Sequence, residues 1–187
     1  QWFIDSCLKI GYLFPRAHAV AYVMMAFRIA WFKVYQPLAY YAAYFTIRAE
    51  GSFNAPVILK GLESQKAELA RIAALEHSTA VEKGNATVIE VAAEMYLRGM
   101  EFLPIDLDRS DASEFKMVDG KLLPPFNCIP ALGDAVAKEI VRARGEHLFT
   151  SKEDLKKRGK VSQSIIDTMD SMGILKNMPD EEQISLF

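Results

Sequence analysis

Residues 18–35 contain neither glycine nor proline, and nearly all of them are apolar. We expect one helix from His18 to Tyr35. A helix that is apolar on every side must be covered by other structure. Its most apolar part, Ala17–Phe32, is shorter than the roughly 20 residues that a membrane span needs, and His18 and Arg28 interrupt it. The pattern therefore predicts a buried core helix and no membrane contact.

Turn and capping residues divide the rest of the first half. Pro37 is expected to end the first helix and to open the next, because proline suits the first helical turn. A polar linker is expected at residues 77–85, and Thr87 with Glu90 forms a capping-box pattern after it. Three further helices are thus expected: Leu38–Ala49, Pro56–Glu76, and one from Thr87 to about Gly99.

The second half contains shorter elements. Asp119-Gly120 favours a tight turn between strands at Phe115–Val118 and Lys121–Leu123. Short helices with glycine turns follow, and Thr150 with Glu153 is read as another capping box. The fold class expected is mainly α, with a small β-hairpin and an extended C-terminal tail. The expected division is residues 1–99, 100–178 and 179–187.

The overall composition excludes few functions. A net charge of -2 argues against a uniformly basic chain, but nucleic-acid binding needs only a local basic face. Cys7 and Cys128 lie far apart and match no metal or redox spacing, so we expect two reduced, buried thiols.

The segment Ile129-Pro130-Ala131-Leu132-Gly133 has the pattern of the turn in a helix-hairpin-helix element. Unpaired N–H groups at such a turn and at the following helix start bind a phosphate oxygen without reading a base. Lys138 and Arg142 add positive charge on that helix. An ordinary connection between two helices is the alternative interpretation.

Basic residues gather again at Lys157, Arg158 and Lys160. Residues 158–162 form a second hairpin candidate, with Ser162 capping the next helix. Two hairpins that follow each other closely suit a non-specific clamp on duplex DNA. A charge run on a solvated helix face is the alternative.

Two other segments suggest binding. Arg16, His18 and Tyr22 lie at a helix start, where a cationic pair and an aromatic ring suit a nucleoside triphosphate. A structural histidine is the alternative for His18. The terminal residues have the form of a short linear motif, or else are a frayed end: Gln183, Ile184, Ser185, Leu186 and Phe187.

The runs FPRAHAVAYVMMAFRIAWFKV, PLAYYAAYF, FLPIDL, PPFNCIPALG and QISLF closely resemble the PolC-type alpha subunit of bacterial DNA polymerase III. The resemblance covers essentially the whole chain in order. It implies the end of the fingers, a duplex-binding helix-hairpin-helix domain, and a pentapeptide that binds the sliding clamp. It also implies a cytoplasmic protein of the bacterial nucleoid.

The resemblance further implies a parent enzyme that extends a primer with deoxynucleoside triphosphates and Mg²⁺. The catalytic aspartates of that family belong to the palm, so we expect this chain alone to hold no metal and to be inactive. Asp106 and Asp108 are assigned no metal for the same reason. Three residues depart from the family pattern: Arg16 replaces lysine, Ala131 replaces glycine, and Ile184 replaces leucine.

Two rival functions stay open. A DNA-repair or recombination accessory protein could use the same hairpin and would prefer junctions or damaged DNA. A pure protein-interaction module would use its aromatic helices to bind protein and would not retain duplex DNA at low salt.

Overall fold

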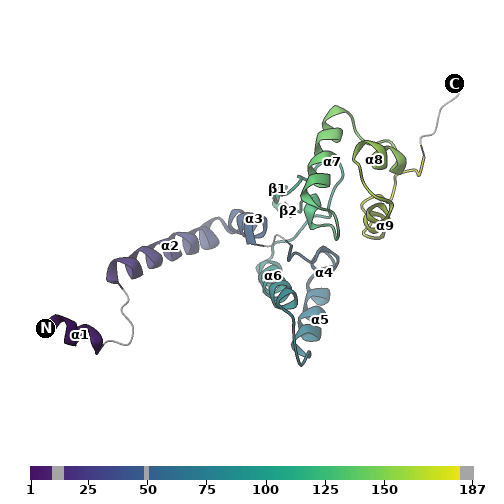
Figure 1. Ribbon diagram of the computed structural model, residues 1–187. Helices are drawn as coiled ribbons and strands as arrows, with labels where there is room; N and C mark the ends of the chain where they lie inside the picture. The colour runs from purple at the N-terminus through teal and green to yellow at the C-terminus, as the bar shows by residue number, and fades with distance from the viewer. Residues whose placement is uncertain (10–14, 49–50, 182–187) are drawn as a thin grey trace, which may run out of the picture. The chain divides into compact units, whose positions relative to one another are not determined.

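The computed structural model describes residues 1–9, 15–48 and 51–181 (Figure 1). The chain divides into two compact units, Gln1–Tyr40 and Tyr41–Phe187, which are described separately below. The described residues are mainly helical with one small antiparallel sheet, so the predicted fold class is confirmed.

The first unit contains α1 (Trp2–Leu8) and α2 (Arg16–Tyr35). The predicted long helix is therefore confirmed. Gln36 ends it by donating its N–H to the Phe32 carbonyl at 2.8 Å. Pro37 is then the first residue of α3 (Pro37–Arg48), as predicted.

The burial predicted for α2 is not found among the described residues. None of the residues of α2 is buried there. With 20 residues and a mean hydropathy of 1.2, α2 is long and apolar enough to cross a membrane by length and composition alone. The argument from length against a membrane span therefore fails. The argument from charge remains, because Arg16, Arg28 and Lys33 lie along the helix.

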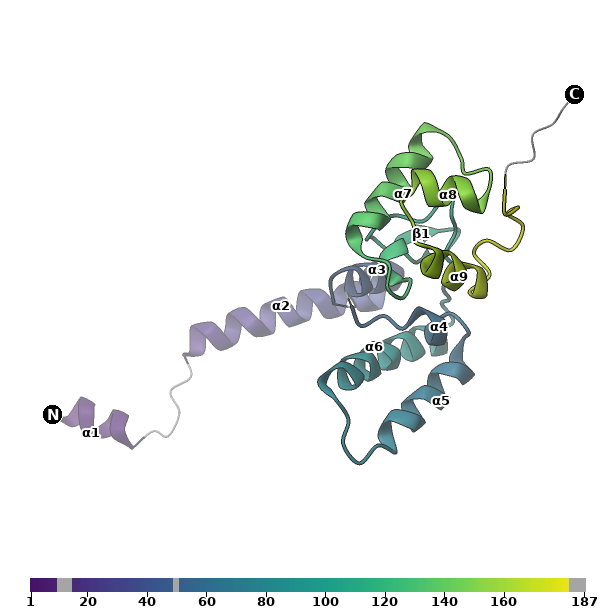
Figure 2. The same cartoon turned by 45° about the vertical axis from the view of Figure 1, so that its right-hand side comes forward.

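In the second unit, the predicted third helix is two helices, α4 (Ala55–Ile58) and α5 (Leu62–Ala73). Gly61 separates them with a φ of 94°, a conformation that side chains other than glycine rarely adopt. The sequence reading missed this break because the apolar spacing continues across it. α5 packs along α6 (Ala80–Leu97) (Figure 2).

The capping box of α6 is formed by Thr79 and Glu82, so the prediction of Thr87 and Glu90 is wrong. The Thr79 hydroxyl accepts from the Glu82 N–H at 3.2 Å, and the Glu82 carboxylate accepts from the Thr79 N–H at 2.9 Å. Thr87 instead lies within the helix and donates to the Lys83 carbonyl. Both T-x-x-E patterns exist in the sequence, and the earlier one gives the helix two more turns. The predicted stop is confirmed, since Gly99 has a φ of 80° just beyond the helix.

Four phenylalanines join the α3 region to the hairpin region. The Phe45 ring lies 5.2 Å from that of Phe102 and 5.5 Å from that of Phe115, and Phe53 lies 5.1 Å from Phe115. The Phe115 N–H also donates to the Thr46 hydroxyl at 3.0 Å. All four rings are buried, so this cluster is a core that joins α3 to the segments just before the β-hairpin.

The predicted β-hairpin is confirmed as β1 (Lys116–Val118) paired with β2 (Lys121–Leu123). Asp119 and Gly120 form its turn with φ values of 52° and 75°. A 3₁₀ turn, η1 (Phe126–Cys128), leads from the sheet into the next segment. Cys128 is buried as predicted, and burial raises the pKa of its thiol; Cys7 is only half-buried.

Three helices complete the unit: α7 (Asp134–Glu146), α8 (Lys152–Arg158) and α9 (Gln163–Ser171). The capping residue of α8 is Ser151, one position after the predicted Thr150. The Ser151 hydroxyl accepts from the Asp154 N–H at 3.0 Å, and the Asp154 carboxylate accepts from the Thr150 N–H at 3.2 Å. The fully buried Ser151 fixes this register.

Candidate nucleic-acid interface

The first hairpin is a tight turn on two buried anchors. Ile129 and Leu132 are buried, and the Leu132 N–H donates to the Ile129 carbonyl at 3.1 Å. Pro130 and Ala131 are exposed at the tip. Ala131 has a φ of 65°, in the region that favours glycine. The alanine is therefore accommodated at this position, but with backbone strain.

Gly133 follows the turn as the N-cap residue of α7, and its carbonyl accepts from the Val136 and Ala137 N–H groups at 3.0 Å each. No acceptor is found in the described parts of the chain for the N–H groups of Ala131 and Gly133. The first N–H groups of α7 likewise lack intrahelical acceptors. The hairpin thus presents backbone donors together with the positive end of a helix dipole.

The second hairpin repeats this arrangement. Lys160 has a φ of 53°, Val161 is buried, and Ser162 is the N-cap residue of α9 without a side-chain capping bond. A Cβ on Gly159 would lie 2.7 Å from the Leu155 carbonyl oxygen, so only glycine lets α8 turn here. The predicted second hairpin is therefore present in the backbone.

The basic side chains near the hairpins differ in whether carboxylates of this chain already bind them. Lys138 is exposed, and no ion pair or hydrogen bond of its side chain is found among the described residues. Arg142 donates from two nitrogens to Glu139, at 2.9 and 3.0 Å, and from a third to Glu146 at 2.6 Å. These carboxylates raise the pKa of Arg142 and partly neutralise its charge.

Glu139 links the two hairpin regions. Its carboxylate also lies 3.0 Å from the Lys160 ammonium. Hydrogen bonds from Arg142, and then from Lys160, lower the pKa of Glu139 to about 2. One carboxylate on α7 therefore orients one cation from each hairpin region.

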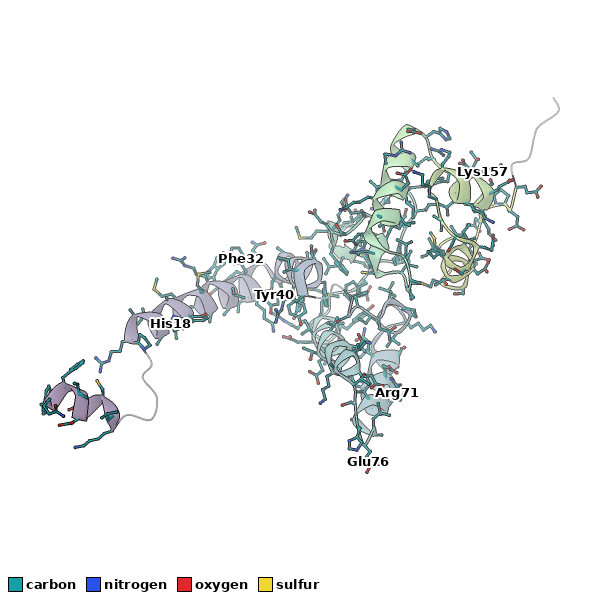
Figure 3. The ribbon with its side chains drawn as sticks, viewed as in Figure 1. His18, Phe32, Tyr40, Arg71, Glu76 and Lys157 are labelled. Atoms are coloured by element: carbon teal, nitrogen blue, oxygen red, sulfur yellow. The ribbon has the colours of Figure 1, made fainter. Side chains whose placement is uncertain are left out.

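The basic cluster at residues 157–158 separates into two roles. Lys157 is highly exposed and pairs with Glu153 at 2.8 Å (Figure 3). Arg158 is directed into the protein: its guanidinium donates to the carbonyls of Ala143 and His147 and to the Asp154 carboxylate. Its side chain is only 19% exposed. Its donors therefore close the end of α7, and DNA binding by Arg158 stays a prediction.

One acidic group opposes an anion at the first hairpin. Asp134 is the first residue of α7, and its carboxylate accepts from the Asn127 amide at 3.1 Å. A carboxylate stabilises a helix start but repels a phosphate at the same place. The amide of Asn127 fixes one oxygen of this carboxylate.

The residues assigned to nucleotide binding lie on the first two turns of α2. The rings of His18 and Tyr22 meet edge to face, with centroids 4.5 Å apart. Arg16 is the exposed first residue of the helix. The spacing predicted from the sequence thus places two of the three side chains in contact.

The terminal segment Gln183–Phe187 lies outside the described residues. The chain just before it is held on α8: the N–H groups of Lys152 and Glu153 donate to the carbonyls of Pro179 and Asp180 at 2.9 and 3.0 Å. The Asp180 carboxylate also lies 3.0 Å from the Lys152 ammonium. These contacts were not predicted, because no local pattern pairs residues so far apart.

Asp106 has a structural role in its loop. Its carboxylate accepts from the N–H groups of Asp108 and Arg109 at 2.8 and 3.0 Å. Among the residues that the structure describes, no group of three or more His, Cys, Asp or Glu side chains could hold a metal ion.

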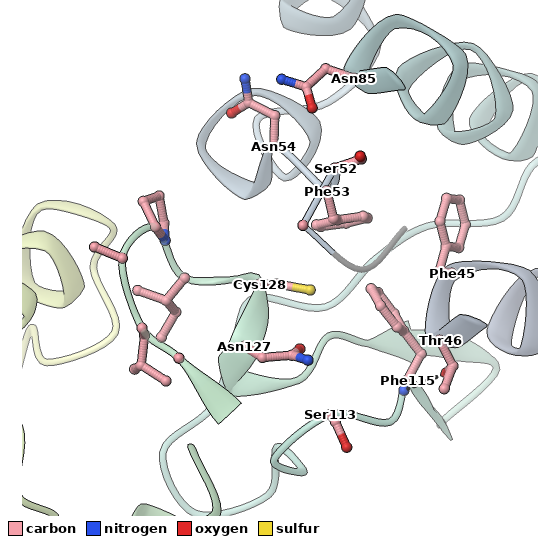
Figure 4. Close-up of a pocket in the computed structure, with 16 residues that line it drawn as sticks. Phe45, Thr46, Ser52, Phe53, Asn54, Asn85, Ser113, Phe115, Asn127 and Cys128 are labelled. Atoms are coloured by element: carbon pink, nitrogen blue, oxygen red, sulfur yellow. Dashed lines mark hydrogen bonds between the residues drawn. The ribbon is translucent and has the colours of Figure 1, made fainter. Parts of the chain in front are cut away.

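A pocket of about 480 Å³ beside the first hairpin was also missed from the sequence (Figure 4). Its lining includes Ser52, Asn54 and Asn85 together with residues 128–133. The sequence did not indicate this pocket, because its polar residues come from a loop and a helix start that only the tertiary fold brings together.

Comparison with known proteins agrees with this geometry. Residues 99–184 match a family described as a helix-hairpin-helix motif. The whole chain is similar to proteins named DNA polymerase III PolC-type. It is 51% identical over 187 residues to the one from Thermotoga maritima, 48% over 188 to that of Clostridium perfringens, and 51% over 188 to that of Bacillus subtilis.

The chain spans only 14% of the first of these relatives and 13% of the other two, whereas each alignment includes 100% of this chain. The motif match contains both hairpins, at residues 129–133 and 158–162. Along its whole length, the chain therefore matches one segment of proteins named DNA polymerase III PolC-type.

Proposed function

We propose that this chain is the duplex-holding part of a bacterial replicative DNA polymerase. The observation that carries the proposal is the pair of hairpins, each with a positive φ at its tip, a buried anchor and an open helix start. Such backbone donors bind phosphates in any sequence. Ala131, Gly133, Lys138 and Lys160 belong to this surface, Ile129 anchors it from the core, and Arg142 and Lys157 contribute weaker charge.

The whole enzyme would join deoxynucleoside triphosphates to a primer with Mg²⁺, at carboxylates outside this chain. Within the chain, Arg16, His18 and Tyr22 would contact the incoming nucleotide, and residues 183–187 would bind the sliding clamp. The protein would act in the bacterial cytoplasm, at the nucleoid, without a membrane.

A salt titration tests the duplex-binding proposal. Binding of the 187-residue chain to a labelled 20-base-pair duplex should weaken steeply as salt rises, because each neutralised phosphate contributes about 0.9 to the log–log slope. Lys138→Glu should weaken binding to duplexes of unrelated sequence alike. Lys176→Glu, at an exposed lysine that belongs to neither hairpin, is the charge-matched control.

The rival functions predict other outcomes. A preference for junctions or damaged DNA over plain duplex would favour a repair accessory protein. No retention of duplex at low salt would favour a protein-interaction module. The identity along the whole chain supports the replicative proposal over both.

A further inference from the structure

The pocket beside the first hairpin lies within the second unit and has two chemically different walls (Figure 4). One wall is the chain from Cys128 to Gly133, which contains the hairpin. The other includes Ser52 and Asn54, just before α4, and Asn85 on α6. A ligand held by the hairpin's backbone donors would therefore have the second wall within reach.

The second wall offers unused donors. Asn54 precedes α4 as its N-cap residue, but its side chain makes no capping hydrogen bond. Neither the Asn54 nor the Asn85 side chain has a hydrogen-bond partner in the described parts of the chain, and both are half-buried. Each amide can donate two hydrogen bonds. By contrast, the Asn127 amide already donates to Asp134.

α6 approaches the loop of this wall closely at Gly84. A Cβ on Gly84 would lie 3.3 Å from the Ser52 hydroxyl oxygen. Asn85, the next residue, therefore lies beside that loop.

We infer that the pocket is a subsite for the DNA sugar–phosphate backbone, in which Asn54 and Asn85 donate to oxygens next to the phosphate held by the hairpin. The inference rests on the proposed duplex binding. None of the described lining residues is acidic or basic, so the carboxylate that opposes the phosphate here is that of Asp134, which accepts from Asn127 beside the pocket. Amide donors to phosphate and sugar oxygens are common where proteins fix the register of a duplex without reading bases.

The neutrality of the pocket gives a distinctive test. Asn85→Ala should lower duplex affinity by roughly threefold to tenfold, the value of one or two neutral hydrogen bonds, with an unchanged salt slope. Lys138→Ala should reduce the slope by about 0.9, because a phosphate-neutralising cation is lost. Asn54→Ala tests the second amide in the same way.

A charge-matched pair adds a control. Asn85→Asp is isosteric but places a carboxylate against the proposed phosphate, and should weaken binding by roughly 30-fold. Asn177→Asp adds the same charge at an exposed residue outside the pocket and should change affinity less than about threefold, as a distant screened charge does. Circular dichroism and thermal melting of each variant establish that the fold is kept.

Three outcomes are separable. If wild-type chain binds duplex with a steep salt slope and only the Asn54 and Asn85 variants weaken it without changing the slope, the subsite is supported. If Lys138→Ala reduces the salt slope as expected but Asn85→Asp and Asn177→Asp lower duplex affinity equally, the subsite is refuted. Another segment of the polymerase is then the better candidate to occupy the pocket. If wild-type chain shows no steep slope, the proposed function itself fails.

Discussion

Arg158 and Lys157 are neighbours in the sequence, but we expect Arg158 to stabilise the fold and Lys157 to contact DNA. Replacing each in turn tests these two roles. Arg158→Ala removes donors to the carbonyls of Ala143 and His147 and to the Asp154 carboxylate. The Asp154 side chain is only 10% exposed, so water replaces these bonds poorly. Lys157→Ala removes one exposed ion pair with Glu153.

The magnitudes follow from these contacts. A hydrogen bond from a charged donor contributes roughly 1.5–3 kcal/mol, and an acceptor left buried adds its own cost. Discounting for the 19% exposure of Arg158, we expect its removal to lower the free energy of unfolding by about 3 kcal/mol. The melting temperature should fall by roughly 6–12 °C for a domain of this size. An exposed pair such as that of Lys157 contributes about 0–1 kcal/mol.

Chemical denaturation and duplex binding together separate the two roles. Below its melting transition, Arg158→Ala should bind duplex nearly as well as wild type. Lys157→Ala should keep its stability and lose about 0.9 from the salt slope if its charge meets a phosphate. Unchanged stability together with lost DNA binding in Arg158→Ala would refute the structural role assigned to this guanidinium.

Three further predictions concern the hairpin, its linking carboxylate and the tail. Ala131→Gly should raise stability by about 0.5 kcal/mol, because relief of the positive φ outweighs the entropy that glycine loses on folding; a less stable variant in urea unfolding would contradict the strain. The Glu139 pKa is lowered from 4.5 to about 2, so its contribution to stability is full above about pH 4.5 and is lost as pH falls toward 2. Glu139→Gln should therefore flatten the dependence of the urea midpoint on pH in that window, and parallel curves for the two proteins would argue against the pairing. Deleting residues 183–187 should abolish calorimetric binding to a purified bacterial sliding clamp and leave duplex affinity unchanged; equal clamp binding by both forms would exclude the tail as the clamp motif.

Local signals predicted the local structure. The proline at position 37, the Asp119-Gly120 turn and the Gly99 stop each act through their own backbone preferences, and each was located correctly. Equivalent capping-box patterns occur at Thr79 and Thr87, and the prediction took the later one, which is wrong. Packing of the helix against α5 extends α6 toward the earlier box, and that packing is not visible in a local pattern.

The candidate site was predictable in part for the same reason. The turn pattern located both hairpins, because a buried anchor and a helix start leave a local trace. The sequence did not show that Arg158 is directed inward, since its two carbonyl acceptors lie 11 and 15 residues away along the chain. Nor could it bring Asn54 and Asn85 to the hairpin, which depends on the shared phenylalanine core.

The most direct test of the account is an amide NMR titration of the ¹⁵N-labelled chain with a duplex at low salt. Backbone N–H groups that bind phosphate should shift strongly and at the same DNA concentration in both hairpins, at Ala131 and Gly133 and at Val161 and Ser162. Duplex binding that leaves these amides unchanged, and shifts only amides elsewhere in the chain, would contradict the claim that the paired hairpins hold the DNA.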